Sequence, residues 1–172
     1  YVNERDMMLA MKNIEASGVA TRFPHPSHLY KVFLSKDWTS QLCLFPEMRV
    51  PATTKVSRSA VERDARGAAE KALATLQSIS SAQLESERLL LATHERERGQ
   101  ASLNGFANRG VAKLGYSWEA HDVFQFDGVD ELAERMTRLF DQKQNTSESV
   151  FVQALVEDAD LEIRTFVVHG DP

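Results

Sequence analysis

The stretch from Gly110 to Phe126 constrains the fold more than any other part of the sequence. It predicts two short strands joined by a small polar loop, because Val111 and Leu114 flank a lysine and Gly115 to Ser117 supplies a bend. A lysine at the end of a strand, followed by small residues with free N–H groups, can hold a polyphosphate by charge and hydrogen bonds. An ordinary hairpin with a solvent-exposed lysine is the alternative that these residues leave open. The other elements can be arranged around this hairpin.

The composition restricts the class of protein. A chain of 172 residues with 42% apolar content is long enough for one domain with a core or for two small lobes. A net charge of −5 argues against a general nucleic-acid or anionic-membrane binder, although it permits a local basic pocket. Cys43 is the single cysteine, which excludes an intrachain disulfide and a cysteine-based metal site. The sequence contains neither an apolar run near the roughly 18 residues of a membrane span nor a signal-peptide pattern. We therefore expect a cytoplasmic protein without a nucleic-acid or membrane partner.

Apolar side chains recur at helical spacing in residues 4–17, in residues 59–79 and in a helix that begins at Gly128. Another helix, second in chain order, is predicted over residues 36–45 from the polar residues at its start. Gly18 is a natural end for the first helix, because glycine tolerates the left-handed backbone conformation. Ser35 and Asp130 are candidate N-caps of the second and fourth helices.

Strand patterns alternate with these helices, so the sequence predicts an α+β fold. The strand-like stretches outside the hairpin are residues 48–56, 150–156 and 161–168. Residues 80–109 are helical by propensity at first and then polar and charged, which predicts a long, partly mobile insert.

The order of several short motifs resembles that of the ATP-grasp superfamily, in its glutathione-synthetase-like and ribosomal-modification-ligase-like branch. The motifs are Ser-Lys-Asp-Trp-Thr opening a helix, Arg-Val-Pro-Ala-Thr opening a strand, Val-Ala-Lys-Leu-Gly-Tyr-Ser-Trp in the hairpin, Phe-Val-Gln-Ala-Leu-Val-Glu, and Asp-Leu-Glu-Ile-Arg-Thr-Phe-Val-Val-His-Gly near the end. Each motif is a short pattern of common residues, and their shared order carries the resemblance.

The resemblance implies an ATP-grasp-like architecture with a small lobe of antiparallel strands and helices. Residues 1–49 would be the end of a preceding α/β domain and a linker helix. Residues 50–152 would form the small lobe, with residues 80–109 as its insert. Residues 153–172 would form the hinge and the start of a second lobe.

The resemblance also implies a nucleotide site built from residues of several motifs. The phosphates would meet two lysines and a covering loop, the adenine would meet the hinge, and the ribose hydroxyls would meet an acidic residue. In that order the matching residues are Lys36, Lys113, Gly115, Ser117, Gln153, Leu155 and Glu162. The loop departs from the family pattern, because Leu114 replaces a proline and Gly115 is its only glycine. By themselves, Lys36 could be a surface residue and Glu162 could belong to the polar face of an edge strand.

The sequence leaves three hypotheses open. The resemblance implies the ATP-binding part of an ATP-dependent carboxylate–amine or carboxylate–thiol ligase that works through an acyl phosphate. Such an enzyme needs a carboxylate substrate and Mg²⁺, whose ligands we expect outside this chain, as in a fragment that lacks the C-terminal metal-binding part. The alternative is a non-catalytic, degenerate ATP-grasp-like structural or interaction subunit that meets a protein partner through residues 80–109. The third is an unrelated α+β domain that carries these patterns by chance.

Overall fold

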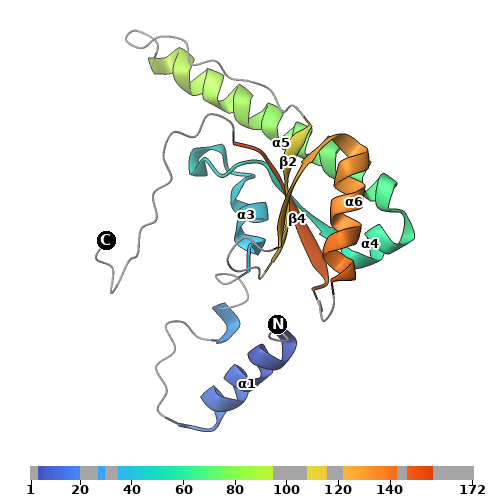
Figure 1. The fold of residues 1–172 in the computed structure, drawn as a ribbon. Coiled ribbons are helices and arrows are strands. Elements are labelled where there is room, and N and C mark those ends of the chain that lie inside the picture. Colours follow the sequence, from blue (N-terminus) through green and yellow to red (C-terminus); the bar gives the residue numbers. More distant parts are fainter. Residues whose placement is uncertain are drawn as a thin grey trace.

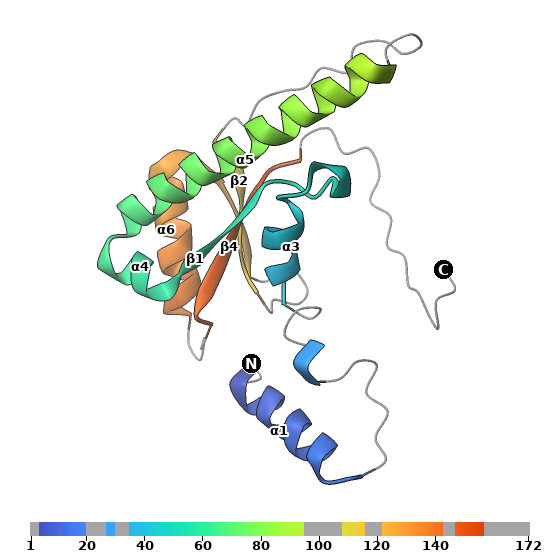
Figure 2. The same cartoon turned by 180° about the vertical axis from the view of Figure 1, so that it is seen from behind.

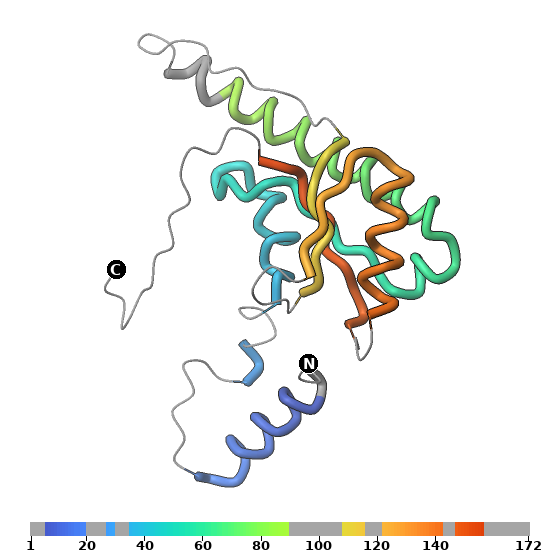
Figure 3. Tube along the Cα trace, viewed as in Figure 1, coloured from blue at the N-terminus to red at the C-terminus, as the bar shows by residue number. Residues whose placement is uncertain are grey.

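The computed structural model describes residues 4–19, 27–29, 35–94, 108–115, 122–142 and 147–156, and Figures 1 and 3 trace their path. The elements in chain order are α1 (Glu4–Ala16), α3 (Asp37–Leu42), the 3-10 helix η1 (Pro46–Met48), β1 (Thr53–Ser57), α4 (Arg58–Arg63), α5 (Ala65–His94), β2 (Arg109–Leu114), β3 (Val123–Asp127), α6 (Gly128–Asp141) and β4 (Ser149–Ala154). The described part is therefore a mixed α+β structure, as the sequence predicts. None of the helices that the structure describes has the length and apolar character needed to cross a membrane.

The four strands form one antiparallel sheet in the order β1-β4-β2-β3. The pairing of the two strands predicted between Gly110 and Phe126 is confirmed, because β2 pairs with β3 and Lys113 lies opposite Val123. Residues 116–121, where the connecting loop was predicted, lie outside the described residues. Strand β4 is the last of the four in the sequence, yet it lies between β1 and β2. It brings Gln153 opposite both Thr53 of β1 and Val111 of β2.

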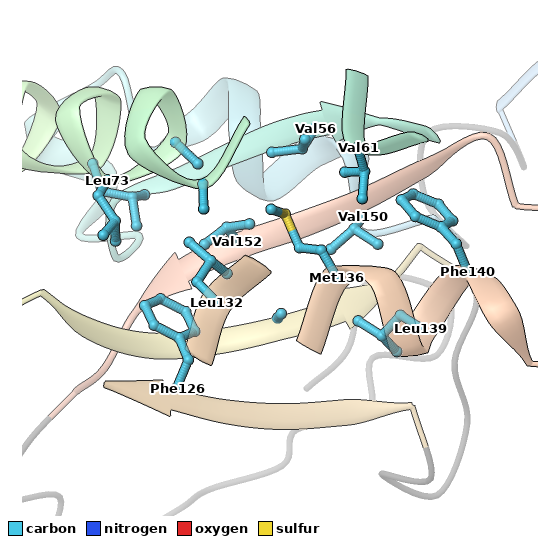
Figure 4. Packing of buried hydrophobic residues seen from close by; sticks show 14 of the residues in the cluster. Val56, Val61, Leu73, Phe126, Leu132, Met136, Leu139, Phe140, Val150 and Val152 are labelled. Atoms are coloured by element: carbon cyan, nitrogen blue, oxygen red, sulfur yellow. The ribbon is translucent and has the colours of Figure 1, made fainter. Parts of the chain in front are cut away.

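One face of the sheet is covered by α4, α5 and α6, and α3 lies on the other face (Figures 1 and 2). The core lies between the sheet and the first group of helices (Figure 4). Its fully buried side chains include Leu76, Leu132, Met136, Leu139, Val150 and Val152. Since side chains alternate along a strand, Phe151 and Gln153 of β4 point to the opposite face. That face carries the residues considered below.

The predicted helix over residues 59–79 is two helices, because Asp64 interrupts it. Asp64 has extended backbone, and its Oδ1 accepts a hydrogen bond from the N–H of Gly67 at 2.9 Å, which caps the start of α5. Helix α5 then continues to His94, past the predicted boundary at residue 79. Residues 80–94 are rich in strong helix formers and contain neither glycine nor proline, so nothing ends the helix there. The rest of the predicted insert, through residue 107, lies outside the described residues.

Two of the predicted capping and boundary positions also differ. Ser35 does contact the helix start, since its Oγ accepts from the N–H of Asp37 at 3.2 Å, but Lys36 holds the N-cap position. Asp130 is not the N-cap of α6, because Asp127 holds that position and Asp130 pairs with Arg66 at 2.6 Å. The predicted stop of α1 at Gly18 is confirmed by a φ of +71°.

The strand predicted over residues 48–56 begins later, at Thr53. Pro46 to Met48 forms the 3-10 helix η1, and Arg49 after it adopts a left-handed conformation with φ of 51°. The helix expected over residues 36–45 is also shorter than predicted. It ends at Leu42, because the chain turns there toward η1. The strand predicted over residues 161–168 lies outside the described residues.

Gln83 of α5 fastens the segment between α3 and β1 to the rest of the fold. Its Nε2 donates hydrogen bonds to the carbonyl oxygens of Cys43, at 2.8 Å, and Val50, at 2.9 Å. Replacing Gln83 with leucine should lower the free energy of unfolding by about 1–2 kcal/mol, because two partly buried carbonyl groups lose their donor. Urea unfolding measures this change. Gln77→Leu, at an exposed position of the same helix, is the matched control, and an equal loss in both variants would contradict the prediction.

Candidate functional site

The sheet face opposite α5 and α6 carries polar side chains from three strands. Strand β1 contributes Thr53 and Lys55, β2 contributes Lys113 and β4 contributes Gln153, as the two-residue alternation requires. Helix α3 covers part of the β1 side. One face of the sheet thus carries polar side chains from three strands, and the segment before β1 also contacts it.

Lys36 reaches this face from a position far away in the sequence. Its backbone N–H donates to the carbonyl oxygen of Gly115 at 3.0 Å, and its Nζ donates to the carbonyl oxygen of Leu114 at 3.0 Å. Both contacts lie at the C-terminal end of β2, directly after Lys113. The structure therefore brings together Lys36, Lys113 and Gly115, three of the residues that the motif resemblance places at the phosphates. Together with Gln153, these residues are called the two-lysine site below.

The charge of Lys113 acts on the ammonium of Lys36. The pKa of Lys36 is lowered to about 8, first by burial and then by the like charge of Lys113, while Asp122 acts in the opposite direction. Burial also lowers the pKa of Lys113. Burial removes hydration from an ammonium, and a like charge nearby further disfavours its protonated form. A bound anion would offset both effects.

A chain of hydrogen bonds crosses three strands beside Lys113. Its Nζ donates to Oε1 of Gln153 at 2.7 Å. Nε2 of Gln153 donates to Oγ1 of Thr53 at 2.9 Å, and that hydroxyl donates to the carbonyl oxygen of Pro51 at 2.8 Å. The Lys113 side chain is therefore fixed by a network that extends to the edge strand β1.

Gly115 lies buried at the end of β2, against the ring of Phe151. A Cβ atom at this position would lie 3.1 Å from Cε2 of Phe151, which is a tight contact. The ring also lies below Lys55, whose Nζ is 5.6 Å from the ring centroid. A small residue at position 115 therefore lets the backbone pass close to Phe151 at the end of β2.

Leu155 lies at the other end of β2 from the two-lysine site. Its N–H donates to the carbonyl oxygen of Arg109 at 3.1 Å, and it lines a pocket of about 420 Å³ at the edge strand β3. Ion pairs run along this pocket, between Arg135 and Glu131 at 2.6 Å and between Arg109 and Asp127 at 3.6 Å. From the strand rise, Leu155 lies about 13 Å from Lys113 along β2. Ser117 and Glu162, the remaining predicted site residues, lie outside the described residues.

Sequence reasoning missed three residues that shape this face, Thr53, Lys55 and Asp122. Lys55 pairs with Asp37 at 3.0 Å, and Asp122 is buried next to the hairpin. The alternation of β1 was a signal for Thr53 and Lys55, because it places both on one face. Asp122 carries no such signal, because it lies in the turn before β3.

A metal centre has no obvious place in the described part of the chain. Among those residues there is no group of three or more histidine, cysteine, aspartate or glutamate side chains that could hold a metal ion. The two-lysine site offers ammonium and amide groups instead. These groups suit an anion.

Comparisons with models of known protein families, with curated proteins and with solved structures find no match to this chain. The resemblance of its motifs to the ATP-grasp superfamily is thus neither supported nor contradicted by a relative. The geometry of the two-lysine site is the firmest guide to its chemistry.

Proposed function

We propose that the two-lysine site binds the phosphate groups of ATP, and that the chain is the ATP-binding part of an ATP-grasp-like carboxylate–amine or carboxylate–thiol ligase. The observation that carries this proposal is the meeting of Lys36 and Lys113 on one half-buried sheet face. Lys36 is held there by two hydrogen bonds to the residues that follow Lys113. Both lysines were expected at the phosphates from the motif resemblance alone.

A phosphate chain is the ligand that best suits this pair of charges. A phosphate group carries up to two negative charges near neutral pH, and each oxygen accepts hydrogen bonds. An ammonium has three N–H donors, and Lys113 uses one of them for Gln153. Binding a polyanion would favour the protonated form of both lysines, whose pKa values burial lowers. A nucleotide laid along β2 with its phosphates at Lys113 would carry its base toward Leu155.

The proposed reaction is a phosphoryl transfer followed by acyl transfer. An oxygen of the substrate carboxylate attacks the γ-phosphorus of ATP, the bond to the leaving ADP breaks, and an acyl phosphate forms. An amine or thiol then attacks the acyl carbon and releases phosphate. Lys36 and Lys113 would stabilise the charge on the transferring group. The Mg²⁺ that the resemblance implies has no carboxylate cluster among the described residues, and the roles given to the lysines do not depend on it.

Calorimetric titration with Mg²⁺–ATP tests the proposal. Lys36→Met and Lys113→Met should each weaken binding about tenfold, which is about 1.4 kcal/mol, because each removes one positive charge from the phosphates. Lys71→Met is the matched control, since Lys71 is an exposed lysine on α5, which covers the opposite face of the sheet. The proposal fails if the protein shows no saturable binding, or if all three variants bind as tightly as the unaltered chain.

A second candidate is a non-catalytic structural or interaction subunit with the same fold. It is favoured by the distal half of α5, which extends past the sheet (Figures 1 and 2) and carries Leu89 with 65% of its surface exposed. Leu89 lies within residues 80–109, where the sequence predicts a surface for a protein partner. Absence of ATP binding, combined with a loss of complex formation in Leu89→Ser, would favour this candidate.

A further inference from the structure

We infer that Gln153 and Thr53 form a positioning device that holds the Lys113 ammonium at the phosphate-binding surface. This inference rests on the proposed function and deepens it. It gives the side chain of Gln153 a different task from the nucleoside contact that the motif resemblance implies. The device consists of one residue from each of two adjacent strands, acting on a lysine in a third.

The hydrogen-bonding chemistry allows only one orientation of the Gln153 amide. The ammonium of Lys113 can only donate, so the atom of Gln153 that faces it at 2.7 Å must be the carbonyl oxygen. The amide nitrogen then faces Thr53, whose hydroxyl accepts from it at 2.9 Å and donates its own hydrogen to Pro51. Every link in the chain thus runs in the same direction, from Lys113 and Gln153 toward Thr53 and the backbone. A flip of the amide would place its NH2 group against the Lys113 ammonium and would break that hydrogen bond.

Burial makes the far end of this chain rigid. Thr53 is only 1% exposed, so its hydroxyl has to be satisfied inside the protein, and both of its hydrogen-bonding functions are used. Its branched side chain is also restricted about χ1. Gln153 lies directly opposite Thr53 in the pairing of β1 with β4. The position of the Gln153 oxygen is therefore set by the sheet register, and Lys113 follows it.

A neutral amide suits this task better than a carboxylate. Glutamate at position 153 would hold the Lys113 ammonium equally well, but its charge would neutralise the charge that attracts phosphate. Glutamine supplies an acceptor for the ammonium without a competing negative charge. Lys113 thus stays available to an anion while its long side chain is ordered before the ligand arrives. Ordering the side chain in advance reduces the entropy lost on binding.

The device is tested by titrating Lys113 in the free protein with NMR of lysine labelled at Cε. The Lys113 signal is identified by its loss in Lys113→Arg. Gln153→Leu should lower the pKa of Lys113, because the charged form loses its acceptor, and Gln153→Glu should raise it. Thr53→Val should lower it less, because the amide is then free to turn. Gln125→Leu, at an exposed position on the same face in β3, should leave it unchanged.

Affinity for Mg²⁺–ATP provides the second readout, and Gln153→Leu and Gln153→Glu should both weaken it three- to tenfold. Gln153→Asn keeps the polarity and shortens the reach, so it tests the idea even if the leucine variant fails to fold. The inference is overturned if the Lys113 titration is the same in every folded Gln153 variant, whether or not ATP binds. If the titration shifts in opposite directions while the unaltered chain binds no ATP, the positioning of Lys113 stands and the proposed function fails.

Discussion

Replacing Gly110 with alanine should lower the free energy of unfolding by about 3 kcal/mol or more, because the central strands leave no space for a methyl group. A Cβ atom at this position would lie 2.2 Å from the carbonyl oxygen of Gln153 and 2.6 Å from Cζ of Phe126. The first contact is with the backbone of the neighbouring strand, so a side-chain rotation cannot relieve it. The second is with a ring that is 3% exposed and packed in the core.

Urea unfolding measures the free energy of unfolding of both variants. Gly128→Ala is the control, because it strains the backbone without creating a steric clash. Gly128 has a φ of +82° but no atom within 4 Å of an added Cβ, so the alanine variant should lose only about 1 kcal/mol. A loss in Gly110→Ala no larger than that in Gly128→Ala would contradict the prediction. The larger loss would also show how closely β2 and β4 approach. That approach fixes the positions of Lys113 and Gln153.

The sequence predicts which helices and strands form better than it predicts the residues at which they begin and end. The hairpin and α6 follow from periodicity, because their apolar residues face a single core. The interruption at Asp64 was missed because apolar positions continue at helical spacing on both sides of it. Only the cap formed with Gly67 reveals the break. The late start of β1 was missed because the sequence pattern predicts extended backbone for the residues before Thr53. Their first part instead belongs to the 3-10 helix η1 and the left-handed turn at Arg49.

The candidate site was only partly predictable, for a topological reason. Lys113 was identified from its hairpin, which is local in sequence. Its contact with Gln153 depends on β4 lying between β1 and β2, and no local pattern fixes that order. The contact of Lys36 with Leu114 joins residues 78 positions apart. Only the motif resemblance suggested that the two lysines would meet, and it did not suggest Thr53.

The affinity for Mg²⁺–ATP should fall about sevenfold between about pH 7 and pH 9.5, because Lys36 loses its proton in the free protein over this range and its charge contributes about tenfold to binding. Its pKa there is about 8, first because the side chain is buried and then because of the like charge of Lys113 on β2, while Asp122 before β3 acts in the opposite direction. Bound phosphate favours the charged lysine and raises its pKa. Binding above pH 8 therefore requires uptake of a proton and weakens as the pH rises. Below pH 8 the proton is already present, so the affinity should level off. Calorimetry in buffers matched for ionic strength measures this dependence.

Lys36→Arg distinguishes titration of Lys36 from a general effect of alkaline pH. A guanidinium stays charged throughout this range, so the variant should lose much less affinity between pH 7 and pH 9.5. A smaller decline should remain, because burial also lowers the pKa of Lys113. If the arginine variant loses affinity as steeply as the unaltered chain, Lys36 is not the titrating group and its place at the phosphates is wrong. If the variant binds weakly at pH 7 but with the shallower slope, the charge of Lys36 acts on the ligand, and the geometry of its ammonium adds to the affinity.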